Sequence, residues 1–140
     1  MEIAWLILAA SLTNGETQSL EWQEEAIANA EASAVRCNSV DDFVPLFRLA
    51  ASREVSGSHT SEELSEVNEN LFLKCPLNFL LALQAQSDAT RASVLELYFG
   101  VRHPPWELGS ELRKWQDHRD VGPFVRREFQ GFLTAEEPSL

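Results

Sequence analysis

Three histidines are the residues of this 140-residue chain with the most obvious capacity for metal or acid-base chemistry. They are His59, His103 and His118. A zinc site needs three or four converging ligands, usually with two of them close in sequence. No two His or Cys residues lie three or four positions apart. We therefore expect no metal ligands and no cofactor.

Signatures of catalysis are also missing from the sequence. There is no Gly-x-Ser-x-Gly elbow, no Cys-His signature and no glycine-rich phosphate loop. Adjacent acids such as Glu24-Glu25, Asp41-Asp42 and Glu62-Glu63 point about 100° apart on a helix, so they do not converge on one substrate. We expect no catalytic residues, and we interpret these pairs as solvated surface.

The two cysteines, Cys37 and Cys75, carry the only covalent chemistry that the sequence predicts. In an exported chain, an even pair is most simply a disulfide. Such a bridge would close a loop of about 39 residues and stabilise the fold by roughly 3 to 4 kcal/mol. The alternative is a pair of buried thiols in a reduced cytoplasmic protein.

The N-terminus favours export. Residues 3–12 form an uninterrupted apolar run, followed by Thr13-Asn14-Gly15 and a polar segment. Ten residues are too few to span a bilayer but suit a secretory signal, so we predict a signal peptide over residues 1–15 and a secreted or periplasmic location. Glu2 is the only charged residue before Glu16. The alternative is a cytoplasmic protein that keeps an N-terminal core helix.

Charge is the most informative surface property. The net charge of −11 argues against binding to nucleic acid or to anionic lipid. Residues 16–71 hold 12 acidic and 3 basic residues, whereas residues 72–140 hold 9 and 8. Arginine and tryptophan dominate the energetics of protein interfaces, and both types gather between residues 102 and 127. The predicted partner-binding residues are Arg102, Trp106, Arg113, Lys114, Trp115 and Arg119. The alternative is a mixed solvated surface with both Trp side chains in the core or at corners.

The elements that position these side chains are expected to be helices and the turns between them, because every periodic segment after the N-terminus has helical spacing. The expected helices are 19–36, 42–51, 60–74, 77–86, 89–99, 108–120 and 122–133. Asp42 is the expected N-cap of the second helix, and Thr60 with Glu63 the expected capping box of the third. Pro76 suits the first position of an almost wholly apolar central helix, Ser87 or Asp88 the next N-cap, and Gly100 a stop.

The fold class follows from this order. We expect an all-α protein of six to seven short helices, packed as stacked α-hairpins or as a compact helical bundle. Helix pairs starting near residues 42, 76 and 110 are spaced by about 34 residues, which is typical of stacked α-hairpins. The run Glu69-Asn70-Leu71-Phe72-Leu73-Lys74-Cys75-Pro76-Leu77-Asn78-Phe79-Leu80 resembles a junction in small HEAT-like helical domains of exported bacterial proteins. That resemblance implies a helical-repeat fold and transfers no functional residue.

We expect a single all-α domain over residues 16–134 and a flexible tail over residues 135–140. The leading functional hypothesis is a non-enzymatic protein-binding domain of the inhibitor, immunity or adaptor type, present as a monomer or weak dimer. Its partner is another protein rather than nucleic acid or a membrane. The alternative is a small helical enzyme or metal-binding protein that uses His103 and His118.

Overall fold

A computed structural model describes residues 18–139, and every regular element in that range is helical. The elements are α2 (Leu20–Ala34), the short 3-10 helix η1 (Val40–Phe43), α3 (Val44–Ser52), α4 (Ser58–Lys74), α5 (Pro76–Gln84), α6 (Asp88–Leu97), α7 (Pro105–Arg113), α8 (Gly122–Glu128) and α9 (Gln130–Leu133). The predicted all-α class is confirmed. The predicted signal peptide, residues 1–15, lies outside the described residues. Within the described residues, no helix has both the length and the apolar character needed to cross a bilayer.

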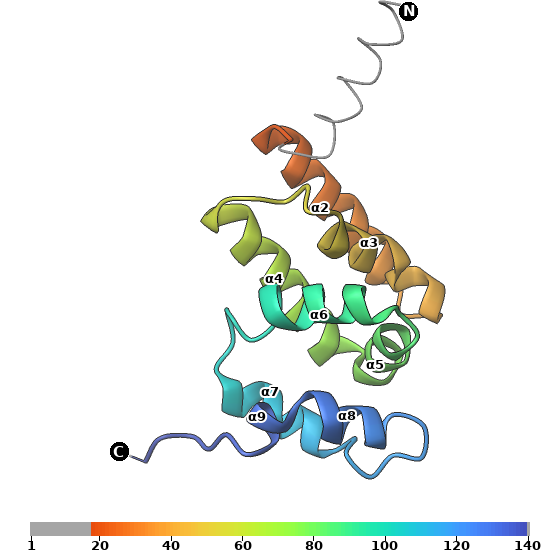
Figure 1. Cartoon of the computed structure of the whole chain (residues 1–140), viewed down its shortest axis with the longest axis vertical. Helices are drawn as coiled ribbons and strands as arrows, with labels where there is room; N and C mark the ends of the chain where they lie inside the picture. The colour runs from red at the N-terminus through yellow and green to blue at the C-terminus, as the bar shows by residue number, and fades with distance from the viewer. Residues whose placement is uncertain (1–17, 140) are drawn as a thin grey trace, which may run out of the picture.

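The helices form two layers. Helices α2 to α6 make an upper bundle, and α7, α8 and α9 lie beneath it (Figure 1). Within the bundle, α2 packs against both α3 and α4, and α3 packs against α6. In the lower layer α7 and α8 both contact α9, and α7 also contacts α4. Because helices distant in sequence pack together, the arrangement is a compact bundle.

A cluster of phenylalanine rings fills the core. Phe79 on α5 contacts the rings of Phe43, Phe47 and Phe72 at centroid distances of 5.4 to 5.9 Å. All four side chains are fully buried, and edge-on packing of this kind adds stability beyond burial. One face of α5 is therefore buried in the core, but the helix is not buried on all sides as predicted, because Leu77 and Leu81 remain half-buried.

Several helix ends follow the predicted local chemistry. The side chain of Ser87 accepts a hydrogen bond from the backbone N–H of Thr90 and caps α6. Pro76 occupies the first turn of α5, where the missing N–H has no intrahelical partner to lose. Gly100 adopts a φ of +87° just beyond α6, a conformation that glycine tolerates best.

Other predicted ends are wrong. Asp42 is not an N-cap; it is the third residue of η1 and closes a capping box that Ser39 opens, with its carboxylate accepting from the N–H of Ser39. Helix α4 begins at Ser58, so Thr60 caps nothing and instead bonds to Gln23 of α2. Its hydroxyl also lies 2.5 Å from the carbonyl oxygen of Ser56, so Thr60 links the start of α4 both to the preceding loop and to α2.

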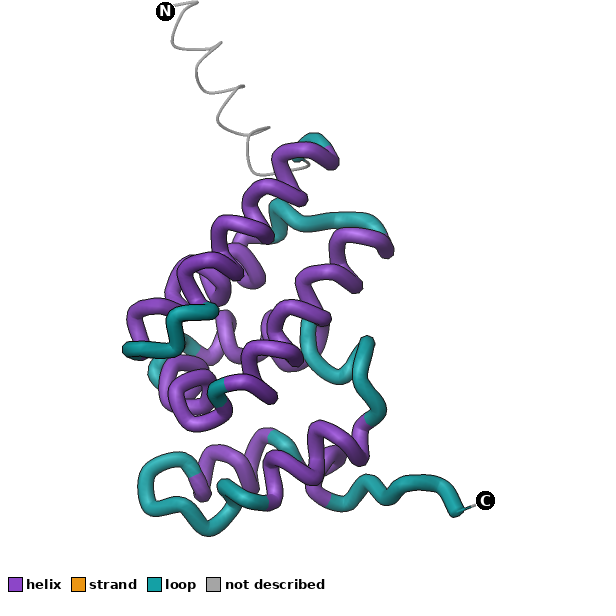
Figure 2. The backbone as a smooth tube through the Cα atoms, turned by 180° about the vertical axis from the view of Figure 1, so that it is seen from behind, coloured by secondary structure: helices purple, strands orange, loops and turns teal. Residues whose placement is uncertain are grey.

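The C-terminal third is also more broken than the predicted helices 108–120 and 122–133. Helix α7 ends at Arg113, and a turn segment follows up to the start of α8. In that turn Nδ1 of His118 accepts hydrogen bonds from the N–H groups of Asp120 and Val121, which hold the chain out of a helix. A second break at Phe129 separates α8 from α9. The loops stand out when the chain is seen from behind (Figure 2).

The predicted disulfide between Cys37 and Cys75 is confirmed. It joins the segment after α2 to the start of α5, with the two Cα atoms 6.1 Å apart. The side-chain amide of Asn78 donates to the carbonyl of Cys37 at 2.6 Å and supports the same junction. A disulfide is compatible with an extracellular location.

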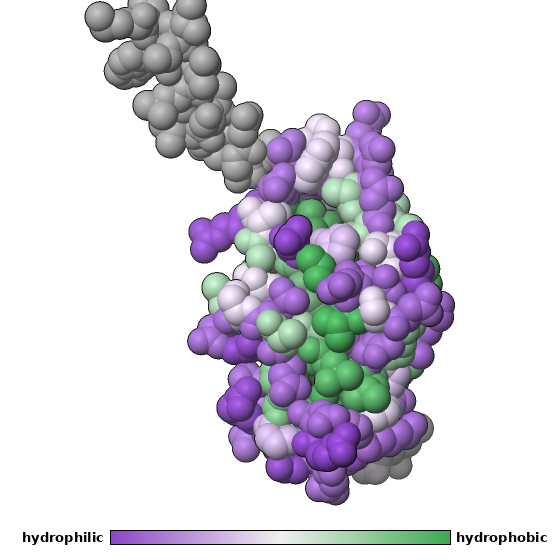
Figure 3. All heavy atoms as spheres, turned by 90° about the vertical axis from the view of Figure 1, so that its right-hand side faces the viewer, coloured by the Kyte–Doolittle hydropathy of each residue, from purple (hydrophilic) through white to green (hydrophobic). Residues whose placement is uncertain are grey.

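Apolar surface gathers on one face. Figure 3 shows hydrophobic side chains running down the middle of the side on which α5 lies in Figure 1, bordered by polar ones. The half-buried Leu77 and Leu81 belong to α5. The predicted binding segment after residue 102 is therefore not the only place where apolar side chains reach the surface.

Candidate functional site

The structure brings two of the six predicted partner-binding residues together. Trp106 and Arg113 both project from α7 into one open groove of about 850 Å³. The opposite wall is the C-terminal segment from Leu133 to Glu137. Arg113 spans the groove, because its Nη1 atom donates to the carbonyl of Leu133 at 3.2 Å.

The other four residues lie apart from this pair. Arg102 forms ion pairs with Glu62 and Glu66 of α4, at 3.4 and 3.6 Å. Lys114 and Trp115 both contact the carboxylate of Glu111. Arg119 is exposed and pairs with its neighbour Asp120. The segment after residue 102 is thus not one continuous basic face.

Beside the groove, α7 packs closely on α9. Gly109 lies so near α9 that an added Cβ atom would sit 2.1 Å from the carbonyl oxygen of Phe132. The walls carry Glu107, Glu136 and Glu137 against the single cation of Arg113. The groove therefore combines a half-buried tryptophan with an excess of negative charge.

A second polar centre surrounds Glu69, in the middle of α4. Its carboxylate has no solvent exposure and accepts hydrogen bonds from the backbone N–H groups of the loop that leads to α7. These donors are Gly100, Val101, Arg102 and His103, at 2.6 to 3.1 Å. The hydroxyl of Ser65 and Nδ1 of His103 complete the shell, at 2.6 and 2.7 Å.

These donors decide the charge state of Glu69. Burial on its own raises the pKa of this carboxyl, but the hydrogen bonds from Ser65, Arg102 and His103 outweigh burial and lower the pKa below its ordinary value. An ionised carboxylate accepts only, so the proton of their shared hydrogen bond lies on Nδ1 of His103. Glu69 therefore anchors the 98–104 loop as a buried anion.

The histidines of the alternative hypothesis are both engaged in holding turns. His103 bonds to Glu69, and Nδ1 of His118 accepts from two backbone N–H groups. Within residues 18–139, neither belongs to a group of three potential metal ligands.

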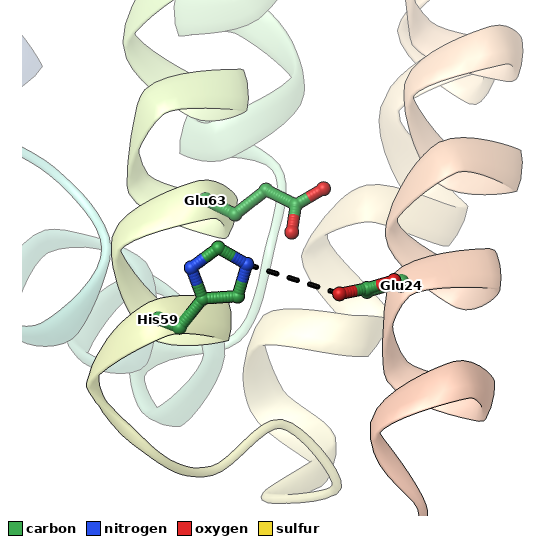
Figure 4. Close-up of side chains that lie close together, drawn as sticks. All are labelled: Glu24, His59 and Glu63. Carbon is green, nitrogen blue, oxygen red and sulfur yellow. Dashed lines mark ion pairs between the residues drawn. The ribbon is translucent and has the colours of Figure 1, made fainter.

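A different histidine does belong to such a group. His59 and Glu63 of α4 lie beside Glu24 of α2, and one ligand atom from each lies within 4.8 Å of the others. Figure 4 shows the three side chains directed into the space between the two helices, with the His59 ring paired to Glu24. The sequence held one local signal, a His and a Glu four residues apart. Nothing local predicts that Glu24 joins them.

No family model, curated protein or solved structure matches this chain. The resemblance of the 69–80 run to HEAT-like domains stays an interpretation of the sequence.

Proposed function

We propose that the chain is a non-enzymatic protein-binding domain of an exported protein, of the inhibitor, immunity or adaptor type. Its binding site is the groove between α7 and the C-terminal segment. The observation that carries this proposal is that Trp106 and Arg113 line that groove together.

The groove has the features of an interface anchor. Tryptophan offers a large contact area and is the residue type most enriched among interface hot spots. Trp106 is half-buried, so its ring is held by the protein while part of it stays accessible. The hydrogen bond from Arg113 to Leu133 and the tight contact at Gly109 hold the two walls together. Because these contacts fix the groove at its Leu133 end, binding there has less entropy to overcome.

The charge of the walls specifies the partner. Three carboxylates face one guanidinium in the groove, and that guanidinium already bonds to Leu133. We infer a partner segment that places an apolar side chain on Trp106 and a Lys or Arg toward Glu136 and Glu137. The complementary charges would set orientation and association rate.

Export is supported by the Cys37–Cys75 disulfide, since such bonds persist in oxidising compartments. The apolar run at residues 3–12 supports it as well.

A random-peptide display library tests the site. We expect the oxidised protein to enrich peptides that combine an apolar residue with Lys or Arg. Trp106→Ala should raise the dissociation constant of these peptides by at least about tenfold, as measured by isothermal titration calorimetry. Trp22→Ala is the matched control, because Trp22 is another tryptophan that reaches the surface but lies on α2. Its peptide affinity should match that of the parent.

Two results would overturn the proposal. One is that no peptide is enriched more strongly on this protein than on a disulfide-bonded helical domain of unrelated sequence. The other is an affinity that Trp106→Ala leaves unchanged or that Trp22→Ala lowers equally. Circular dichroism of both variants must match the parent, so that affinity and not folding is compared.

A further inference from the structure

We infer that Glu24, His59 and Glu63 form a binding site for a divalent transition-metal ion such as Zn²⁺, which would bridge α2 and α4. The three ligand atoms lie within 4.8 Å of one another before any ion is bound. The inference is independent of the proposed groove.

The ligand types select the class of ion. One imidazole nitrogen with two carboxylate oxygens suits Zn²⁺ and its neighbours, whereas Ca²⁺ needs six to eight oxygen ligands. His59 and Glu63 are four residues apart on α4, so both project from the same helix face. Glu24 supplies the third ligand from the facing helix.

A buried polar contact next to the site fixes α2 and α4 relative to each other. Gln23 and Thr60, the neighbours of Glu24 and His59, are 4% and 1% exposed. The N–H of Ser56 donates to Oε1 of Gln23 at 2.9 Å, and the hydroxyl oxygen of Thr60 lies 2.9 Å from the same Oε1 and 2.5 Å from the carbonyl oxygen of Ser56. Because this contact sets the register of α2 against the first turn of α4, Glu24 and His59 face each other before a metal arrives.

The local charge favours a cation. Glu24, His59 and Glu63 share a surface pocket of about 410 Å³ with Glu62, Glu66 and Arg102. Arg102 pairs with Glu62 and Glu66. Among residues 18–139, Glu24 and Glu63 have no Lys or Arg ion pair. Two carboxylates therefore remain for the ion.

Closing the site requires only side-chain movement. Tetrahedral ligands about 2.1 Å from a zinc ion lie about 3.4 Å from one another, so the ligand atoms must approach by up to about 1.4 Å. The side chains of His59 and Glu24 are 77% and 47% exposed and have room to rotate. Three protein ligands leave one coordination position for water, as in open zinc sites.

The test is calorimetric titration of the untagged, chelator-treated full chain with ZnCl₂, together with thermal unfolding. We expect one ion per chain and a rise in the melting midpoint of at least about 3 °C at saturating metal. His59→Ala and Glu24→Gln should each weaken binding at least about tenfold, because each removes one of three ligands. Glu25→Gln is the matched control, since it removes the same charge from the next, exposed position of α2. It should leave the zinc affinity within about twofold.

The variants also test whether the ion bridges α2 and α4. If Glu24→Gln binds as tightly as the parent while His59→Ala does not, the ion sits on α4 alone and the bridging site is wrong. No binding by the parent, or equal affinity in His59→Ala, overturns the site altogether. His59 is exposed, and within residues 18–139 its one ion pair is with Glu24. Both variants should therefore fold, and circular dichroism in the absence of metal checks this.

Discussion

At the scale of single residues, Glu69 is the most constrained side chain of the described protein. A buried carboxylate is strongly destabilising unless hydrogen bonds replace its water. Four backbone N–H groups, one hydroxyl and one imidazole do so here. As a result, the single side chain of Glu69 fixes the 98–104 loop, which connects the two layers.

Neutralising this anion should destabilise the fold. Glu69→Gln keeps the shape of the side chain, but it places an amide donor against N–H donors and removes the charge. We expect the free energy of unfolding to fall by at least about 2 kcal/mol in urea titrations at pH 7. Glu66→Gln, on the exposed face of the same helix, should change it by less than about 0.5 kcal/mol. Equal losses in the two variants would contradict the anchoring role of Glu69.

The same residue should shape the response to acid. The pKa of Glu69 is lowered in the folded state, so the unfolded chain takes up this proton at a higher pH than the folded one. The stabilisation is therefore complete above the ordinary glutamate value of about 4.3 and is lost as the pH falls through the lowered pKa. In urea titrations between pH 5 and about 3, Glu69→Gln should show a shallower fall in stability than Glu66→Gln. Parallel curves would show that Glu69 does not titrate differently in the two states.

At the scale of helices, two contacts connect elements that the sequence alone leaves separate. Gly109 allows α9 to approach the backbone of α7, and the disulfide joins the end of α2 to the start of α5. The first contact can be altered by one substitution, and the second by reducing one bond.

Gly109→Ala should separate α7 from α9. The new methyl group would meet backbone atoms of Phe132 that no side-chain rotation can move, and overpacking of this kind costs about 1 to 3 kcal/mol. Gly131→Ala is the control, because a Cβ there meets nothing within 4 Å and alanine favours helix. Thermal unfolding should show a lower midpoint for the first variant and an unchanged or higher midpoint for the second. The reverse order would place the tight contact elsewhere.

Reducing the disulfide should lower stability by roughly 3 to 4 kcal/mol, because the bridge restricts the unfolded chain over a 38-residue separation. At this chain length that is a fall in melting midpoint of roughly 10 °C or more. The chain has no third cysteine, so reductant acts on this bond alone. Alkylation and mass spectrometry of the native protein supply the check: two freely modified thiols would show that the bond does not form.

At the scale of the whole molecule, Phe99 joins the two layers. Its ring contacts Phe72 and Phe79 of the upper bundle at 5.6 and 6.1 Å, and Phe129 and Phe132 of the lower layer at 5.7 and 5.4 Å. It is 4% exposed. One aromatic cluster thus runs through both layers, and we expect them to unfold together.

Phe99→Ala should therefore weaken cooperativity as well as stability. Truncating a buried phenylalanine costs about 3 to 5 kcal/mol. In urea, the parent should give coincident transitions by tryptophan fluorescence and by far-ultraviolet circular dichroism, whereas Phe99→Ala should give separated ones. Phe47→Ala removes an equally buried ring that contacts Phe43 and Phe79 within the upper bundle, and its transitions should stay coincident. Separation in both variants, or in neither, would contradict the joining role of Phe99.

Local sequence was enough to predict the helical class, most helix positions, an N-cap at Ser87 or Asp88 and the start of α5 at Pro76, and the cysteine count favoured the disulfide over two free thiols. Each depends on neighbours within about four residues or, for the disulfide, on there being only two cysteines. Hydrophobic spacing and caps are local properties, so they are visible in the chain.

The use of the polar residues, in contrast, depends on tertiary packing. Thr60 has the spacing of a capping box, yet it bonds to Gln23 of another helix. Glu69 becomes a buried anchor because the 98–104 loop brings it donors from more than 30 residues away. The same holds for the meeting of Glu24 with His59, and of Trp106 with the C-terminal segment. A buried polar group must find partners wherever the packing places them, and packing is set by the whole chain rather than by any one segment.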